Sequence, residues 1–244
     1  MKEQLLAVMT QNKVFSVMLR GLYGMGKTVL AVAMAQLMGL YSYQIVPANG
    51  AVAISRPATV HVVDECHQIS STENLYQPME THKFIFCTNM GSLLPEPFLS
   101  RCFQFRLEPY TGNELCRIFQ NHAGNESVTL STDVGRFLAA RSKGNPRTGI
   151  MRMRKYLSLA KLRRCGVSIS TASSIFDEFG IDQRGLDAID RRYLDSLVTG
   201  PKSARTLQAI LGTDKREFDR RESYLIRTRL VLITSRGRSL CLPL

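Results

Sequence analysis

The residues from Gly21 to Thr28 read G-x-x-x-x-G-K-T, and this loop constrains the fold more than any other feature of the chain. An apolar run over residues 14–19 precedes it and is typical of a buried strand, while residues 29–38 after it have the composition of a helix. Strand, glycine-rich loop and helix in this order place backbone N–H groups and a helix N-terminus around a polyphosphate. The sequence therefore predicts an α/β domain that binds a nucleoside triphosphate.

The side chains of this loop have distinct expected roles. Lys27 is expected to reach the β- and γ-phosphates, and the hydroxyl of Thr28 is expected to ligate Mg²⁺. The residues expected to bind the nucleotide are Gly21, Tyr23, Gly24, Met25, Gly26, Lys27, Thr28 and Val29. The predicted cofactors are thus a nucleoside triphosphate and Mg²⁺.

Two later apolar runs end in polar pairs, the first in Asp64 and Glu65 and the second in Thr88 and Asn89. In an open parallel sheet ligands bind at the carboxyl ends of the strands, so both pairs are expected to share an edge with the phosphate loop. Asp64 is expected to hold Mg²⁺, and Glu65 is expected to polarise the attacking water. Thr88 and Asn89 would hydrogen-bond the γ-phosphate or that water, although a capping role stays open for them.

Two arginines follow at places where a guanidinium could meet a phosphate. Arg101 comes soon after the second polar pair and could reach the γ-phosphate of a neighbouring subunit; a solvated surface arginine is the alternative. Arg147 stands at an expected helix start after Gly144-Asn145-Pro146, and it could fold over the nucleotide. A surface position stays open for Arg147 too, but the helix dipole disfavours a cation there unless an anion is close.

The second half of the chain changes in pattern and in charge. Residues 1–100 carry six basic and six acidic residues, whereas residues 101–244 carry 26 and 14, which accounts for the whole net charge of +12. A basic half on a neutral nucleotide-binding half favours nucleic acid as the partner over a generally basic surface. Six scattered cysteines without a C-x-x-C pair suit a reducing cytosol and argue against zinc. No stretch is typical of a signal peptide or a membrane span.

The expected elements of this second half are mostly helices. Helical patterns are expected over residues 113–122, 133–141, 147–162, 186–197, 204–211 and 217–228. An alternating run over residues 230–235 then ends in Arg236-Gly237-Arg238. Three short helices and a β-ribbon with a basic tip are the layout of a winged helix-turn-helix. A further short helix is expected over residues 70–80, and a turn over residues 47–50.

The phosphate loop, the two polar pairs and the two arginines, in this order, resemble the AAA+ ATPases. The likeness is strongest to the RuvB family of bacterial Holliday-junction branch-migration motors, and it runs through most of the chain. The segments that carry it are Asp64-Glu65-Cys66-His67, residues 91–103, 105–111 and 141–147, Gly185-Leu186-Asp187 with Asp190, Tyr224-Leu225-Ile226 and Arg236-Gly237-Arg238. The last three are the most discriminating, because many unrelated motors share a phosphate loop.

The resemblance implies an α/β fold: a three-layer P-loop AAA+ core with a parallel sheet over residues 1–108, a small helical lid over residues 109–183 and a winged-helix domain over residues 184–244. It implies DNA-dependent ATP hydrolysis with Mg²⁺ in a homo-oligomeric ring or spiral, such as a hexamer, in the bacterial cytosol. Duplex or branched DNA would be contacted through Arg236 and Arg238, mostly at phosphates and therefore in a salt-sensitive way.

The chain departs from the family in two places. Only about twenty residues precede the loop, where the family has a longer segment over the adenine, and residues 68–82 are expected to be too short for the family's hairpin that docks a junction-binding partner. A reduced or divergent form, such as a phage-encoded one, would fit these departures. Two alternatives stay open: a clamp-loader-type ATPase, which would end in helices, and a nucleotide-gated DNA-binding module with little turnover.

Overall fold

The computed structural model describes residues 2–10, 14–45, 52 and 59–241. The chain forms two compact units, residues 1–109 and residues 110–244. The turn expected over residues 47–50 lies outside the described residues. None of the helices in the described ranges is long and apolar enough to cross a membrane.

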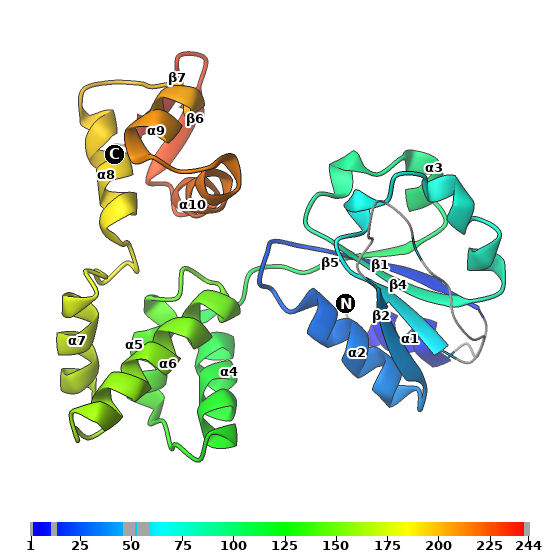
Figure 1. Cartoon of the computed structure of the whole chain (residues 1–244), viewed down its shortest axis with the longest axis horizontal. Coiled ribbons are helices and arrows are strands. Elements are labelled where there is room, and N and C mark those ends of the chain that lie inside the picture. The colour runs from blue at the N-terminus through cyan, green and yellow to red at the C-terminus, as the bar shows by residue number, and fades with distance from the viewer. Residues whose placement is uncertain (1, 11–13, 46–51, 53–58, 242–244) are drawn as a thin grey trace. The chain divides into compact units, whose positions relative to one another are not determined.

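A parallel sheet forms the centre of the first unit. Its described strands are β1 (Ser16–Arg20), β2 (Tyr41–Ile45), β3 (Thr59–Val63), β4 (Lys83–Thr88) and β5 (Phe103–Arg106). Their spatial order is β2-β3-β4-β1-β5. The helices of this unit are α1 (Lys2–Thr10), α2 (Lys27–Leu37) and α3 (Glu96–Leu99). Figure 1 shows α1 and α2 on one side of the sheet and α3 on the other, which confirms the predicted three-layer α/β core.

The strands at the centre of the sheet are apolar because both of their faces are covered. Residues 17–19 of β1 and 84–87 of β4 have no exposed surface. The sequence predicted the central strands β1, β3 and β4 but neither β2 nor β5, which lie at the two edges of the sheet. Edge strands need less apolar surface, so their pattern is weaker.

The prediction of a single helix over residues 70–80 is wrong. The structure has short 3₁₀ segments here, namely η2 (Thr72–Leu75) and η3 (Pro78–Glu80), after η1 (Cys66–Gln68). Pro78 stands at the start of η3, where its ring is tolerated. Inside one continuous helix it would remove a hydrogen bond and clash with the preceding turn, so the segment divides at this point.

Helices make up most of the second unit. They are α4 (Gly112–Asn125), α5 (Thr132–Ala140), α6 (Pro146–Leu162), α7 (Ile169–Glu178), α8 (Ala188–Val198), α9 (Ala204–Leu211) and α10 (Lys215–Arg227). Each of them begins after a side chain that accepts a hydrogen bond from the first turn. These capping residues are Thr111, Ser131, Asn145, Ser168, Asp187, Ser203 and Asp214.

Helix α7 was not expected from the sequence. Its first half, Ile-Ser-Thr-Ala-Ser-Ser, has weak helix propensity because hydroxyl side chains compete for backbone hydrogen bonds. The helix forms because Ile175 and Phe176 are buried in a core shared with α4, α5 and α6, where Phe176 meets Phe137 edge-on at 5.4 Å between ring centroids.

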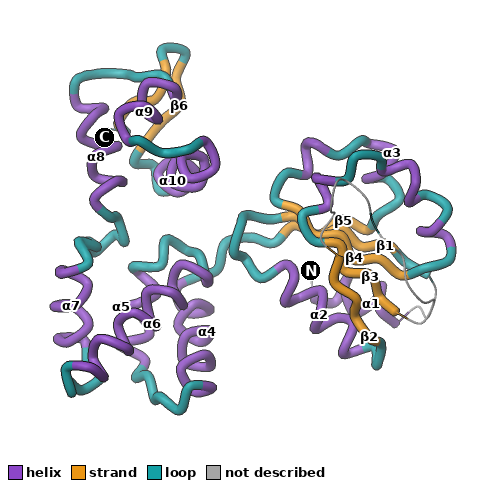
Figure 2. The backbone as a smooth tube through the Cα atoms, in the orientation of Figure 1, coloured by secondary structure: helices purple, strands orange, loops and turns teal. Residues whose placement is uncertain are grey.

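The C-terminal part of this unit has its own core and a β-ribbon. Tyr193 of α8 stacks on Phe218 of α10 with 5.6 Å between ring centroids. Strands β6 (Val231–Thr234) and β7 (Gly237–Leu240) pair antiparallel, and Figure 2 shows them as a hairpin. Strand β6 packs against α10 and strand β7 against α8. The backbone of Arg238 also forms an antiparallel β-bridge with Lys202, which connects the ribbon to the loop between α8 and α9. The fold is the predicted winged helix.

Candidate nucleotide-binding site

The phosphate loop joins β1 to α2 and is shaped by glycines. Gly24 and Gly26 have φ angles of 76° and 79°, which side chains other than glycine rarely adopt. Lys27 is only 6% exposed, and its Nζ donates to the carbonyl oxygens of Gly21 and Leu22 at 3.0 Å each. The ammonium is therefore held inside the loop, next to the N-terminus of α2, where an anion is favoured.

Thr28 and Asp64 meet at the edge of the sheet. The Thr28 hydroxyl donates to Oδ2 of Asp64 at 2.7 Å, while Oδ1 of Asp64 accepts the Glu65 N–H at 3.0 Å. Hydroxyl and carboxylate oxygens are the ligands Mg²⁺ prefers, and it usually takes the rest from waters and substrate phosphates. Among the described residues no group of three His, Cys, Asp or Glu side chains could hold a metal. This pair therefore fits a Mg²⁺ ion that is bound together with a nucleotide.

The second polar pair lies beside the first because β4 stands between β3 and β1. Thr88 is fully buried, and its carbonyl accepts the Gly21 N–H at 3.2 Å. Asn89 is exposed just beyond the strand. The strand order thus brings the loop, Asp64 with Glu65, and Thr88 to one edge, as expected for parallel strands.

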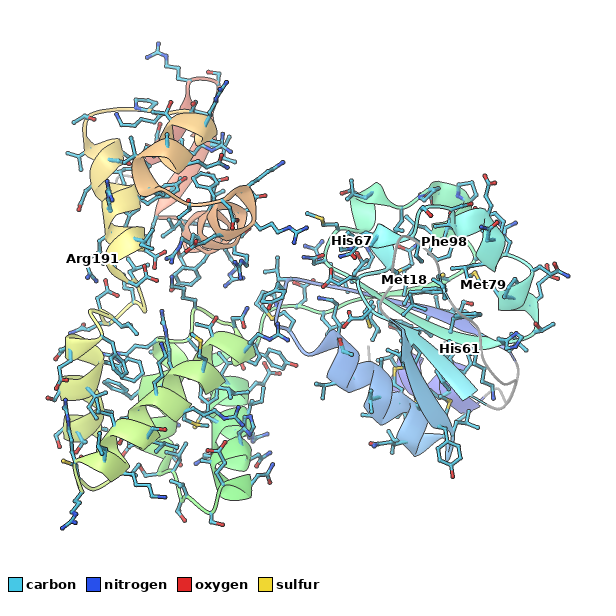
Figure 3. All side chains as sticks on the ribbon, viewed as in Figure 1. Met18, His61, His67, Met79, Phe98 and Arg191 are labelled. Atoms are coloured by element: carbon cyan, nitrogen blue, oxygen red, sulfur yellow. The ribbon has the colours of Figure 1, made fainter. Side chains whose placement is uncertain are left out.

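His67 links the two polar pairs, which the sequence did not indicate. Its Nδ1 lies 3.1 Å from Oγ1 of Thr88 and 3.5 Å from Oε2 of Glu65. The Met90 N–H also donates to Oγ1 of Thr88, at 3.0 Å. Figure 3 shows His67 beside the sheet. Its closeness in sequence to Asp64 and Glu65 was the one signal that could have suggested a role for His67 at this site.

The remaining predicted ligands of the loop differ in exposure. Met25 is buried, so it can offer a nucleotide its backbone N–H but little side-chain surface. Tyr23 is 37% and Val29 74% exposed. Behind the loop, burial and, to a smaller extent, the nearby Asp64 carboxylate together raise the pKa of Cys87 to about 12. The Cys87 thiol therefore stays neutral and is excluded as a metal ligand or nucleophile.

The two arginines belong to different units. Arg101 is exposed and follows α3 in the first unit. Arg147 is exposed in the second unit, as the second residue of α6. Its role toward a nucleotide stays a prediction.

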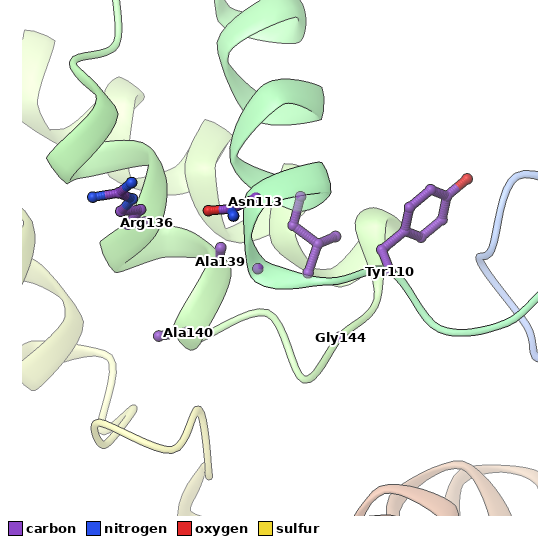
Figure 4. Close-up of a pocket in the computed structure, with 8 residues that line it drawn as sticks. Tyr110, Asn113, Arg136, Ala139, Ala140 and Gly144 are labelled. Carbon is purple, nitrogen blue, oxygen red and sulfur yellow. The ribbon is translucent and has the colours of Figure 1, made fainter.

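A shallow hollow of about 340 Å³ lies in the second unit, near the segment that carries Arg147 (Figure 4). Its lining residues are Tyr110, Gly112, Asn113, Leu115, Arg136, Ala139, Ala140 and Gly144. Gly144, with a φ angle of 69°, lies three residues before Arg147. The sequence did not reveal this hollow, because its lining comes from three separate segments.

The two arginines expected at the basic tip have different surroundings. Arg236 is exposed in the turn between β6 and β7. Arg238 donates through Nε and Nη2 to the Glu222 carboxylate at 2.8 and 3.1 Å. Glu222 also accepts from the Tyr193 hydroxyl at 2.7 Å. Arg236 is therefore the better placed of the two for a phosphate, and Arg238 supports the ribbon.

Known proteins resemble this chain along most of its length. Residues 183–241 match the family model described as the RuvB C-terminal winged helix domain. A Holliday junction branch migration complex subunit RuvB from a Nocardioides species is 30% identical, across 91% of this chain and 72% of the relative. The chain belongs to the RuvB family. The RuvB of Gluconobacter oxydans is likewise 30% identical, across 92% of this chain and 75% of the relative.

A solved RuvB structure supports the fold. The Thermotoga maritima RuvB Holliday junction branch migration motor matches with a TM-score of 0.85, 23% identity, and coverage of 98% of this chain and 90% of that one. Membership of the RuvB family also agrees with strands β6 and β7 after Gly185. A clamp-loader-type ATPase, the first alternative, would have helices only in this region.

Proposed function

We propose that this RuvB-family chain is an ATP-dependent DNA motor, which hydrolyses ATP at subunit interfaces to translocate duplex DNA and drive Holliday-junction branch migration in recombination and repair. The relatives from Nocardioides and Gluconobacter are named as branch migration complex subunits. The observation that carries the proposal is the 2.7 Å hydrogen bond between Thr28 and Asp64, because it joins the phosphate loop to the acidic strand end.

Each residue at the sheet edge has a proposed part in hydrolysis. Lys27 binds the phosphates of ATP, and Thr28 with Asp64 would hold Mg²⁺, which when bound neutralises phosphate charge. Glu65 orients the attacking water and polarises it, since it directly follows Asp64 at the strand end and its side chain is 29% exposed. Thr88, supported by Asn89, positions that water or the γ-phosphate.

Two arginines complete the proposed site, and one of them comes from a second copy of the chain. We infer that Arg101 reaches the γ-phosphate bound by a neighbouring subunit, and that Arg147 contacts the nucleotide of its own subunit. The proposed assembly is a homo-oligomeric ring or spiral, such as a hexamer. An exposed Arg101 without an acidic partner among the described residues supports this role.

DNA is the proposed polyanionic partner of the second unit. Arg236, at the exposed tip of the ribbon, would contact phosphates, with Arg238 beside it. Such contacts position a protein on DNA without reading its sequence. A junction-binding protein is a further proposed partner, since the relatives are subunits of a complex. It would dock without the family's hairpin, for which residues 68–82 are expected to be too short. The proposed setting is the bacterial cytosol.

Steady-state ATP hydrolysis with and without duplex DNA tests this proposal. DNA is expected to stimulate hydrolysis, and Glu65→Gln is expected to lower kcat by about 100-fold or more, as loss of a general base does. Lys27→Ala should abolish turnover. Glu73→Gln, an exposed acid in η2, is the matched control and should keep the wild-type rate. A normal rate in Lys27→Ala would refute the proposal.

Single-turnover hydrolysis separates the motor from a nucleotide-gated binding module. A motor releases product and repeats the cycle, so its single-turnover and steady-state rates should both rise when DNA is added. A module would bind ATP with the same residues yet hydrolyse it negligibly with or without DNA. That second result would favour the module.

A further inference from the structure

The guanidinium of Arg101 is held in a defined place although the side chain is exposed. Its Cζ lies 4.2 Å from the centroid of the Tyr76 ring, and its Nη1 donates to the Pro97 carbonyl oxygen at 2.6 Å. A cation over an aromatic face is attracted by the ring quadrupole. The two contacts restrain a long side chain that would otherwise sample many rotamers.

Tyr76 is itself anchored to the first unit. It directly follows η2, and its N–H donates to the Glu73 carbonyl at 3.1 Å. The ring is half-buried and packs against the core cluster that contains Leu75, Phe86 and Phe98. The ring therefore presents a fixed face, whose position depends on the segment between β3 and β4.

The contacts leave the charge of Arg101 available to a ligand. In the described part of the chain, Arg101 has no carboxylate partner, and the Pro97 carbonyl is its one hydrogen-bond acceptor. Nε and Nη2 can therefore still donate to phosphate oxygens. An arginine with only a structural role would be expected to pair with a carboxylate. Arg101 makes no such pair among the described residues.

We infer that Tyr76 is a positioning residue for Arg101, and that it holds the guanidinium ready for the γ-phosphate bound by a second copy of the chain. The inference rests on the proposed function, in which Arg101 acts between subunits. Holding the side chain in advance lowers the entropy lost when the two subunits and the nucleotide come together. In this proposal Tyr76 contacts neither ATP nor the attacking water and acts through Arg101 alone.

Mixed assemblies test this inference, because they separate the subunit that supplies Arg101 from the subunit that hydrolyses ATP. The hydrolysing subunit carries Arg101→Ala and an intact phosphate loop. The supplying subunit carries Lys27→Ala and, in addition, either Tyr76→Leu or Tyr76→Phe. Leucine keeps the apolar packing but lacks the π face, whereas phenylalanine keeps both. ATP hydrolysis of the mixture then reports only on the supplied arginine.

With Tyr76→Leu in the supplying subunit, hydrolysis is expected to fall about threefold to fivefold, which is the size of an exposed cation–π contact. Tyr76→Phe should restore the rate. Tyr76→Leu placed in the hydrolysing subunit should change nothing, because that subunit has no Arg101 to position. A loss in this second arrangement, an unchanged or higher rate in the first, or no rescue by Tyr76→Phe would overturn the inference.

One further mixture distinguishes the inference from the proposed function. Lys27→Ala with Arg101→Ala in the supplying subunit should give no hydrolysis. If this mixture is as active as the one with Arg101 intact, the intersubunit role of Arg101 is wrong, and the role of Tyr76 is wrong with it. If it is inactive while Tyr76→Leu supplies a fully effective arginine, only the role of Tyr76 is wrong.

Discussion

Glu65 turns the chain out of β3 with a left-handed backbone, at φ 49° and ψ 42°. For a residue other than glycine this conformation is uncommon and costs on the order of 1 kcal/mol. It brings the Glu65 carboxylate back toward His67, 3.5 Å from Nδ1. Such backbone strain is often found at functional sites, so it supports the proposal that the position of the Glu65 carboxylate matters for function.

His67 is predicted to hold Glu65 and Thr88 in their working orientations. His67→Ala removes the hydrogen bond to Thr88 and the contact with Glu65, together worth roughly 1.5 kcal/mol, and should lower kcat for ATP about tenfold with little change in KM. His67→Asn, whose amide can replace Nδ1, should recover part of the loss. Steady-state kinetics check both. Wild-type kcat in His67→Ala would show that the histidine only fills space.

Among single residues, the sequence indicated the candidate ligands better than the residues that contact them. The positions of Lys27, Thr28, Asp64 and Glu65 at one edge of the sheet could be predicted, because a fixed spacing and a strand end define them. His67 could not, because its contact with Thr88 crosses between two strands. Tyr76 was missed for the same reason, since its contact with Arg101 spans 25 residues and depends on the packing of η2.

Among the elements, α8 and α10 are joined to the start of α6 by a group of charged side chains. Asp190 is fully buried and accepts from Lys143 Nζ, from Arg221 Nη1 at 3.0 Å and from the Asp187 N–H at 2.9 Å. Arg221 also donates to both Asp187 oxygens, at 2.7 and 2.8 Å. These bonds connect the segment before Arg147 to the winged helix.

Asp190→Ala is predicted to destabilise the second unit by about 3 kcal/mol, because it removes the fully buried carboxylate that pairs with both Lys143 and Arg221. Urea unfolding of the full chain measures the loss of unfolding free energy, and hydrogen exchange of peptides from α8 shows in a separate experiment whether the loss lies in the second unit. Asp195→Ala is the matched control, since Asp195 is an exposed acid on the same helix and should change little. Equal stability of the two variants would contradict the prediction.

Asp187 makes the stability of this group depend on pH. Burial disfavours its charge, but hydrogen bonds from Arg221 and the charge of Lys143 outweigh burial and lower its pKa to about 2. An unfolded aspartate has a pKa near 3.9, so the contribution is complete above about pH 4 and is lost as the pH falls toward 2. The shift corresponds to roughly 2 kcal/mol.

The comparison of wild type with Asp187→Asn isolates this contribution. The difference in unfolding free energy between the two proteins should shrink as the pH falls from 5 to about 2, because asparagine does not titrate. Urea titrations at several pH values measure it. A difference that stays constant over this range would mean that Asp187 does not have a lowered pKa.

Elements could be predicted where local chemistry marks them. The helices of the second unit, except α7, follow capping residues and amphipathic patterns that the sequence displays. Strands β2 and β5 alternate aromatic and polar residues over only five and four positions, and this short strand pattern was not recognised. Helix α7 depends on a core built by residues distant in the chain. The split of residues 70–80 into η2 and η3 was marked by Pro78 but was not recognised as a break.

At the scale of the whole molecule, charge is divided between the two units. Residues 1–109 carry eight basic and seven acidic residues, whereas residues 110–244 carry 24 and 13. The first unit holds the phosphate loop and the acidic strand end. The proposed ATP site therefore lies in the first unit, and most of the positive charge that would attract DNA lies in the second. DNA affinity is therefore expected to depend on salt while basal nucleotide binding depends on Lys27.

Arg236→Ala is predicted to weaken DNA binding uniformly across sequences and to reduce the slope of log affinity against log salt by about 1, as loss of one phosphate contact does. Arg238→Ala should change that slope less, because Glu222 already pairs with Arg238. Fluorescence anisotropy with labelled duplex DNA at several salt concentrations measures both slopes. Equal slopes for wild type and Arg236→Ala would remove Arg236 from the DNA contact.

The central claim, that ATP hydrolysis at the Gly21–Thr28 loop moves branched DNA, is tested most directly with a synthetic four-way junction whose arms can separate into two labelled duplexes. With ATP and Mg²⁺ the wild-type chain, with a junction-binding RuvB partner protein added where needed, is predicted to convert the junction to duplexes. Glu65→Gln is predicted to bind the junction and leave it intact. Conversion at the same rate by Glu65→Gln, or by wild type without ATP, would contradict the account.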